Sequence, residues 1–227
     1  MTVYDVVRYA HISAGTLALA CFWTAASLRK GSEGHRIVGR TFLIAIVVLC
    51  VTGLGIASAA FERQEPVRGT FFLYLVLITA TPSWIAWRAI RDKRDVKRFA
   101  GPLYRALGWA NLAAGGIVLA LGIRYQQIIL SVVSGIGLVA GAAILRFAGK
   151  LPAGRTWWLA RHYGAMVGVG IATHVAFLNL GLSHVVPAEW GTAVARVSWF
   201  APITLALIAR VWLDRKYGVR RPVVATA

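Results

Sequence analysis

The sequence is poor in charged residues and especially poor in acidic ones. Charged residues fill 15% of the 227 positions, with eight Asp and Glu against 25 Lys and Arg. Apolar residues fill 58%, whereas soluble globular domains are about 45–50% apolar and about 25% charged. This composition excludes a disordered chain and argues against a soluble domain. A net charge of +17 suggests nucleic acid in a soluble protein, but basic residues also gather at the cytoplasmic ends of membrane spans, so we expect no nucleic-acid partner.

Cysteine is scarce as well. The two cysteines, Cys21 and Cys50, fall inside long apolar runs, where a thiol usually serves as a small packing group. No cysteine lies in a segment expected outside the membrane, so the sequence predicts no disulfide framework.

The few acidic residues exclude several transport functions. A proton pump or ion-coupled transporter normally needs a carboxylate within the membrane, and a retinal protein needs a buried lysine. All eight acids lie in loops or at the ends of apolar runs, and all five lysines lie in segments expected in the cytoplasm. Hydrolase motifs such as H-E-x-x-H and G-x-S-x-G and the phosphate loop are missing too. The sequence therefore names no catalytic residue and leaves open whether the protein is an enzyme.

Long uncharged runs dominate what is present. A helix needs ~20 apolar residues to cross the hydrocarbon of a membrane, and lipid cannot satisfy the polar groups of an open strand. The sequence therefore predicts an all-α, polytopic membrane protein whose residues 1–227 form a single seven-helix transmembrane domain. The predicted spans are 9–28, 41–61, 69–87, 106–123, 128–145, 163–183 and 197–209.

The basic residues predict the orientation of these spans. Twenty of the 25 Lys and Arg residues fall within 29–40, 88–105, 146–161 and 210–221, which alternate spans place on one side. By the positive-inside rule the N-terminus lies outside and the C-terminus lies in the cytoplasm. We expect the basic face to lie against anionic lipids.

Histidine is the residue type with the most chemical information. The topology places His11 and His174 in the outer half of the membrane, with His184 in the last outer loop, and places His35 and His162 near the inner surface. Two layers of histidine are typical of haem b membrane proteins, in which two imidazoles bind each iron and stacked haems carry electrons. A transition metal ion can use the same groups. Arg36 and Arg40 lie beside the inner pair, as does Arg161, and can hold haem propionates.

A second interpretation of the histidines is structural. His162 and His174 are twelve residues apart, which turns them ~120° from each other around a helix, whereas cytochrome b proteins usually place both histidines of one helix on a single face. Each histidine can instead bond lipid phosphate, a helix end or a polar group of a neighbouring helix. For Asn111 in the fourth run we expect an interhelical hydrogen bond.

Small residues and prolines predict how the helices pack. Gly137 and Gly141 form a narrow face on the fifth run that suits close helix packing. Pro82 lies within the third run and should kink it. Nearby hydroxyls, including that of Ser83, can then satisfy the carbonyl groups that the kink frees.

Two stretches resemble a family of bacterial integral membrane proteins defined by a domain of unknown function. The shared pattern is H-I-x-x-G from His11, K-G-x-x-x-H-R-x-x-G-R from Lys30 and R-H-x-x-x-M from Arg161. The resemblance covers roughly the first 45 and the last 70 residues. It implies a helical fold in a bacterial cytoplasmic (inner) membrane and includes His11, His35 and His162 in the pattern. His174 stands where the family often has a small or β-branched residue.

A fainter likeness involves the segment around His35. Glu33-Gly34-His35-Arg36 is similar to the Glu-x-x-His-Arg motif of haem A synthases, in which the histidine binds haem, although Glu33 is one residue closer to its histidine here. The likeness implies haem at His35 but not that family's reaction.

Two functions therefore remain open on the sequence alone. The first is a haem b or metal-binding electron-transfer protein with His35, His162, His11 and His174 as candidate ligands, Arg36 and Arg40 beside them, and a quinone or redox protein as partner. The second is a non-catalytic accessory subunit, or a small-molecule binding or transport protein, in which the histidines are structural.

Overall fold

The structure is a computed structural model that describes residues 2–152, 154–181, 187 and 190–217. His184, a candidate from the sequence, lies outside the described residues. The described chain is helical throughout and contains no strand, so the prediction of an all-α protein is confirmed.

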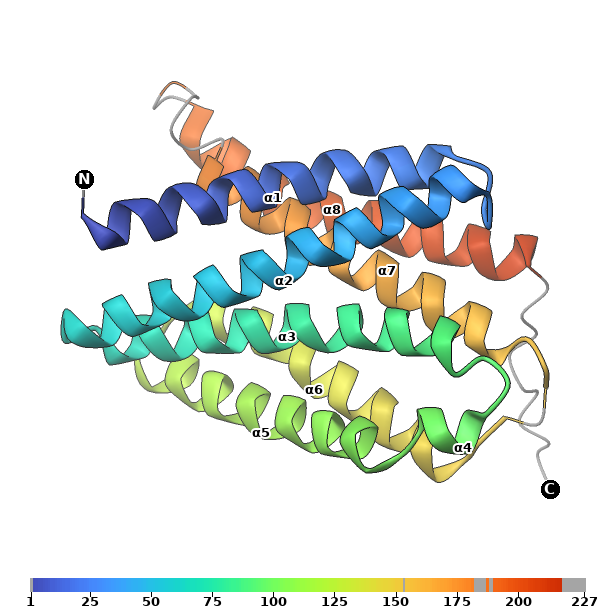
Figure 1. The fold of residues 1–227 in the computed structure, drawn as a ribbon. Coiled ribbons are helices and arrows are strands. Elements are labelled where there is room, and N and C mark those ends of the chain that lie inside the picture. Colours follow the sequence, from blue (N-terminus) through green and yellow to red (C-terminus); the bar gives the residue numbers. More distant parts are fainter. Residues whose placement is uncertain (1, 153, 182–186, 188–189, 218–227) are drawn as a thin grey trace.

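Long helices run back and forth along one axis (Figure 1). A four-residue helix, α4 (Val96–Phe99), lies between α3 and α5, and a π-helical turn, η1 (Phe177–Gly181), extends α7. The long helices are α1 (Val3–Ser27), α2 (Glu33–Glu62), α3 (Pro66–Arg91), α5 (Pro102–Arg124), α6 (Ile128–Gly149), α7 (Trp157–Ala176) and α8 (Gly191–Lys216).

Local sequence explains where several helices begin. The Ser32 hydroxyl accepts a hydrogen bond from the backbone N–H of His35 and starts α2, because an N-cap satisfies an amide without a partner in the helix. Pro66 and Pro102 occupy the first turns of α3 and α5, where a missing N–H costs nothing.

Among the described residues, four helices are long and apolar enough to cross a membrane: α2, α3, α5 and α6. Two basic segments that lie between predicted spans are partly helical. Arg36 and Arg40 belong to α2, which begins at Glu33, and most of 88–105 is helical. The reason is that capping residues, rather than the edge of the apolar run, decide where a helix starts.

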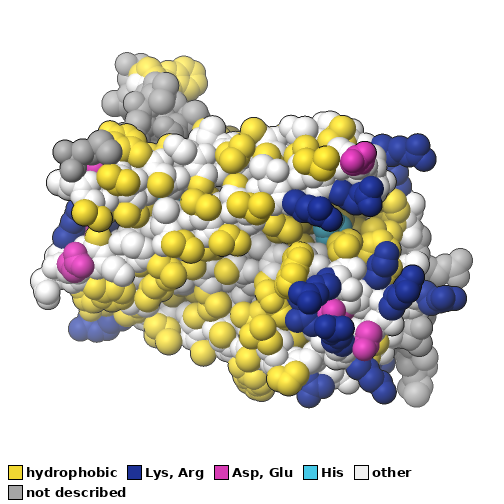
Figure 2. All heavy atoms as spheres, viewed as in Figure 1, with side chains coloured by type: hydrophobic (Ala, Val, Ile, Leu, Met, Phe, Trp, Pro, Cys, Tyr) yellow, Lys and Arg dark blue, Asp and Glu magenta, His cyan; other side chains and the backbone are white. Residues whose placement is uncertain are grey.

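Positive charge gathers at one end of the molecule. Figure 2 shows Lys and Arg side chains concentrated where α1 meets α2 and where α3 meets α4, with an apolar surface between the two ends. Since each long helix reverses direction, segments separated by two helices return to the same end (Figure 1).

Glycines bring α5 and α6 into backbone contact. A Cβ on Gly141 would lie 2.6 Å from the carbonyl oxygen of Gly108, and a Cβ on Gly137 would lie 3.0 Å from that of Asn111. Gly108, Gly115 and Gly122 recur every seven residues on the facing side of α5. The prediction of a small-residue packing face on the fifth run is confirmed.

Buried polar side chains tie α3 to α5 and α6. Asn111 is fully buried, and its Nδ2 donates to Thr81 Oγ1 on α3 at 2.9 Å, which confirms the expected interhelical bond. The Tyr74 hydroxyl donates to the carbonyl of Val133 at 2.9 Å and accepts from the N–H of Gly137 at 2.8 Å. The Tyr74 hydroxyl therefore bridges the Val133 carbonyl and the Gly137 N–H, which lie four residues apart in α6 and would otherwise bond each other.

Pro82 lies inside α3 as predicted. The hydroxyl of Ser83 donates to the carbonyl of Thr79 at 2.8 Å, so a nearby hydroxyl does bond a backbone carbonyl beside the proline. Cys21 is buried, Cys50 is half-buried and both are free thiols, as expected for packing residues.

Candidate functional site

The inner histidines each bond a backbone carbonyl of another helix. His35, in the first turn of α2, places Nδ1 3.0 Å from the carbonyl oxygen of Ala25 on α1. His162, in the second turn of α7, places Nδ1 3.0 Å from that of Ala86 on α3. A carbonyl only accepts, so Nδ1 carries the proton in both rings. In the neutral ring Nε2 then keeps a lone pair, and neither Nε2 bonds a described residue.

The two rings lie at the same end of the helices, although more than half of the chain separates them. His35 bonds Ala25 near the end of α1, and His162 bonds Ala86 near the end of α3, and both helices end on the same side of the molecule (Figure 1). Further in, Phe42 and Ile46 of α2 belong to the same buried apolar cluster as Val169 of α7.

The cations beside this pair differ in their surroundings. Arg36 and Arg40 are exposed on the first turns of α2. Arg161 is half-buried, and its guanidinium lies 3.7 Å from the centre of the Phe147 ring on α6. It makes no hydrogen bond or ion pair with the described residues. Its charge interacts with the hydroxyl of Tyr104, which is fully buried and has no hydrogen-bond partner among those residues.

The end of α1 carries a second cation at this site. Lys30 Nζ donates to the carbonyl oxygens of Ala25 at 2.9 Å and Ala26 at 2.5 Å, which are carbonyls left open at a helix C-terminus. Burial, together with the charge of Lys216, lowers the pKa of Lys30 below its ordinary value. The carbonyl of Ala25 thus accepts from both Lys30 and His35.

His11 bonds a side chain of α2. Its Nδ1 lies 2.9 Å from the hydroxyl oxygen of Thr52 on α2. That hydroxyl donates to the carbonyl of Val48 at 2.8 Å, so its oxygen accepts from His11. The backbone of Leu49 also lies within hydrogen-bonding reach of the His11 ring.

His174 has both ring nitrogens engaged. Nδ1 lies 2.7 Å from the carbonyl oxygen of Gly170, and Nε2 accepts from the indole N–H of Trp23 at 2.9 Å. Trp23 is twelve residues beyond His11 on α1, which is about 18 Å of helix. The predicted outer pair of His11 and His174 therefore shares no hydrogen-bond partner. The predicted divergence of His162 and His174 is confirmed, since one faces α3 and the other faces α1.

A polar cluster lies between α7 and α8, and its residues were not among the candidates from the sequence. The hydroxyl of Tyr163 donates to Asp214, and Arg210 Nε donates to the same carboxylate at 3.1 Å. The i, i+4 spacing of Arg210 and Asp214 predicts their ion pair, but nothing in the sequence indicates that Tyr163 joins them.

The described residues form no cluster of side chains that could hold a metal ion on its own. In the ranges that the structure describes, no three His, Cys, Asp or Glu side chains come together as a metal site. Haem requires less of the protein, because the porphyrin supplies four nitrogens and the chain supplies only the axial ligands.

Comparisons with known proteins found no match to a family model, to a curated protein or to a solved structure. The resemblance to a bacterial membrane family therefore stays a prediction.

Proposed function

We propose that this chain is a bacterial inner-membrane protein that binds one haem b between His35 and His162 and transfers electrons. The observation that carries the proposal is that both imidazoles donate Nδ1–H to a backbone carbonyl. Histidines that bind metals almost always anchor their second nitrogen in this way, because the bond fixes the tautomer and the ring orientation. Both rings then keep Nε2 available, and their position at the same end of the helices supports a shared site.

The proposal assigns different roles to the other candidates. Arg161 is the half-buried cation next to His162 and suits a haem propionate, with Arg36 and Arg40 at the exposed side of the site. His174 is structural in this proposal, because Trp23 already occupies its Nε2. His11 bonds Thr52 of α2, and we assign it no iron. The iron of a bound haem gains and loses one electron, and a quinone or redox protein is the proposed partner.

An absorption spectrum tests the proposal. The full chain, purified in detergent from cells supplied with haem, should show a Soret band and sharp α and β bands after reduction with dithionite. His35→Ala and His162→Ala should each lose these bands. Thr41→Ala is the control on α2, because its hydroxyl bonds only the preceding turn at Ile37. A colourless wild-type protein would overturn the haem proposal and leave the histidines as ties between helices.

A second pair of variants separates lost ligation from misfolding. His35→Met and His162→Met replace one imidazole with a thioether, which also binds haem iron and raises its potential. We expect haem retention with a higher midpoint potential in each. Retention with an unchanged potential would show that the histidine is not a ligand. His174→Ala should keep the full haem content.

We also propose seven spans, with α1, α7 and α8 joining the four apolar helices, the N-terminus outside and the C-terminus in the cytoplasm. Cysteine labelling tests this orientation in a Cys21→Ala, Cys50→Ala background. A membrane-impermeant maleimide should label Gln127→Cys, at the start of α6, in intact cells. It should label Lys97→Cys, on α4, only after the cells are opened. The reverse pattern would invert the topology.

A further inference from the structure

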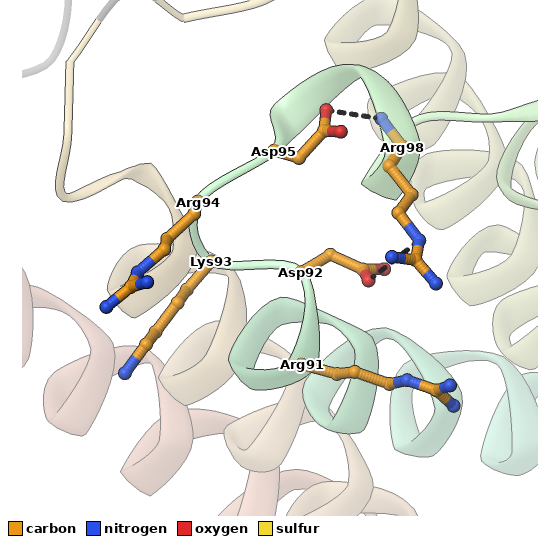
Figure 3. A pocket seen from close by; sticks show the side chains of 6 residues that line it. All are labelled: Arg91, Asp92, Lys93, Arg94, Asp95 and Arg98. Atoms are coloured by element: carbon orange, nitrogen blue, oxygen red, sulfur yellow. Dashed lines mark hydrogen bonds and ion pairs between the residues drawn. The ribbon is translucent and has the colours of Figure 1, made fainter.

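The turn from α3 into α4 forms an open surface pocket of about 330 Å³. Figure 3 shows the six side chains that line it, four of them basic and two acidic. The lining residues are Arg91, Asp92, Lys93, Arg94, Asp95 and Arg98.

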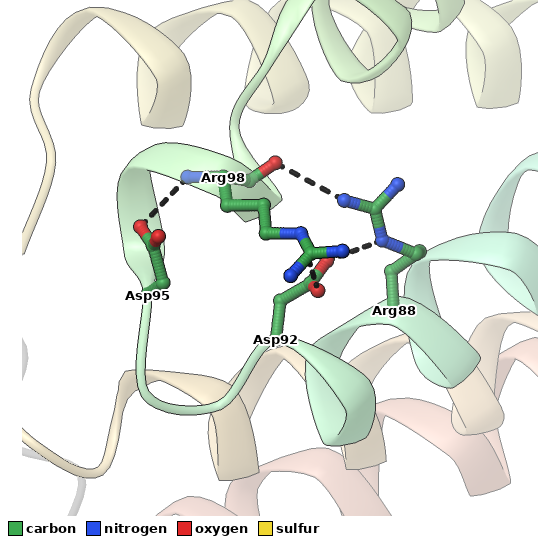
Figure 4. A network of polar contacts seen from close by, with 4 residues as sticks. All are labelled: Arg88, Asp92, Asp95 and Arg98. Atoms are coloured by element: carbon green, nitrogen blue, oxygen red, sulfur yellow. Dashed lines mark hydrogen bonds and ion pairs between the residues drawn. The ribbon is translucent and has the colours of Figure 1, made fainter.

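Both acidic side chains of the pocket already bond groups of the protein. Asp92 is 1% exposed and pairs with Arg88, and its second oxygen lies 3.6 Å from Arg98 Nε (Figure 4). Asp95 caps α4 by accepting from the backbone N–H of Arg98 at 2.8 Å. Arg88 also donates to the carbonyl of Arg98 at 3.1 Å. This network fixes the shape of the turn, and Arg88 and Arg98 neutralise the carboxylate of Asp92.

Three cations of the pocket remain without a carboxylate. Arg91, Lys93 and Arg94 are exposed and form no ion pair with a described residue. The side chains of Lys93 and Arg94 extend in the same direction, away from the two acids (Figure 3). Two adjacent positive groups on a rigid turn suit an anion such as phosphate.

The pocket also borders an apolar surface. The guanidinium of Arg91 lies 5.0 Å from the Trp87 ring, and Lys93 Nζ lies 5.9 Å from the Trp158 ring of α7. Trp87 is 44% exposed, and the neighbouring Ile90 is 42% exposed. Indole rings favour the membrane–water boundary, so a ligand here can place a charged group on the turn and an apolar body against the helices.

We propose that this pocket binds the phosphate of an anionic phospholipid headgroup, held by Lys93 and Arg94 with Arg91 at its edge. The proposal goes beyond diffuse attraction of a basic face to a membrane, because it assigns a defined site on a turn that an internal ion network shapes. It uses the proposed membrane placement but not haem, so loss of the haem proposal leaves it intact.

Native mass spectrometry of the full chain tests the site by counting retained lipid. The probes are phosphatidylglycerol and phosphatidylcholine with identical acyl chains. Lys93→Gln with Arg94→Gln should weaken retention of phosphatidylglycerol about 25-fold, since each cation contributes about fivefold near anionic lipid and the two factors multiply. Retention of phosphatidylcholine should not change.

Two further variants make the result specific. Arg63→Gln with Arg124→Gln removes the same charge at the opposite end of the helices and should leave phosphatidylglycerol retention unchanged. Lys93→Arg with Arg94→Lys keeps both charges and should preserve it. An equal loss in the test and control pairs, or no loss in either, would overturn the site.

Competition with inorganic phosphate shows whether the pocket binds a phospholipid headgroup or free phosphate. If added phosphate does not displace the lipid, the headgroup together with its acyl chains is the ligand, as proposed. If phosphate displaces the lipid and itself binds with the same dependence on Lys93 and Arg94, the pocket is a site for free phosphate, and the lipid assignment is wrong.

Discussion

Two regions of this protein pack in different ways. In the glycine-packed region, formed by α3, α5 and α6, the backbones of α5 and α6 touch, and the buried polar residues include Tyr74, Thr81 and Asn111. In the histidine region, formed by α1, α2, α7 and α8, side chains fill the space and histidines tie helix to helix. The Tyr74 hydroxyl and the Asn111 N–H bond neighbouring helices, whereas His35 and His162 each keep an Nε2 that bonds no described residue. Under the proposed function, the glycine-packed region is the scaffold beside the half that binds haem.

The same substitution should have very different effects in the two regions. At Gly141 a new Cβ would meet backbone atoms, the Gly108 oxygen at 2.6 Å and the Leu112 nitrogen at 2.9 Å. At Gly164 it would meet only the end of the Arg210 side chain, at 1.8 Å. We expect Gly141→Ala to destabilise the protein by about 1–3 kcal/mol, because a helix backbone cannot move aside.

Gly164→Ala should cost less than about 1 kcal/mol, because a flexible guanidinium can move and alanine favours a helix. Gly135→Ala is the control, since nothing lies within 4 Å of its new Cβ. Thermal unfolding in detergent measures all three variants. Equal losses at positions 141 and 164 would remove the distinction between the regions.

Removing the hydroxyl of Tyr74 should have the next largest effect. Tyr74→Phe leaves the N–H of Gly137 and the carbonyl of Val133 without the group that links them. We expect a loss of about 1–2 kcal/mol in the free energy of unfolding. Tyr9→Phe, on an exposed face of α1, should change nothing. If Tyr74→Phe left the free energy of unfolding unchanged, the Gly137 N–H would bond the Val133 carbonyl directly and Tyr74 would contribute only packing.

The smallest expected effect is pH-dependent and lies at the start of α1. The backbone N–H and then the hydroxyl of Thr2 lower the pKa of Asp5 below its usual 3.8. Because the folded pKa is depressed, the stabilisation is present above the unfolded pKa and is lost as pH falls through the folded value. Amide protection in the first turn should therefore fall as the pH drops from about 5 through 3.8 and below. Asp5→Asn should abolish that pH dependence, and a persisting dependence would exclude Asp5 as its source.

The sequence could predict the features of the site that depend on spacing along a single helix. The levels of His35 and His162 follow from helix length and rise, and the fold places both at the same end. The sequence could predict that Asn111 bonds a neighbouring helix, but not that Thr81 is its partner. The contact of His174 with Trp23 was not predictable, because it depends on the tilt of α7 against α1.

Composition and periodicity by themselves determined the helical class, the apolar segments and the concentration of charge at one end, because each is a property of consecutive residues. Only the tertiary structure decided which nitrogen of each histidine is engaged and which cations of the α3–α4 turn stay unpaired. These outcomes depend on how helices rotate about their axes and which backbone carbonyls then come within reach. The physical reason is that a hydrogen bond acts over about 3 Å, a scale that sequence spacing does not specify between separate helices.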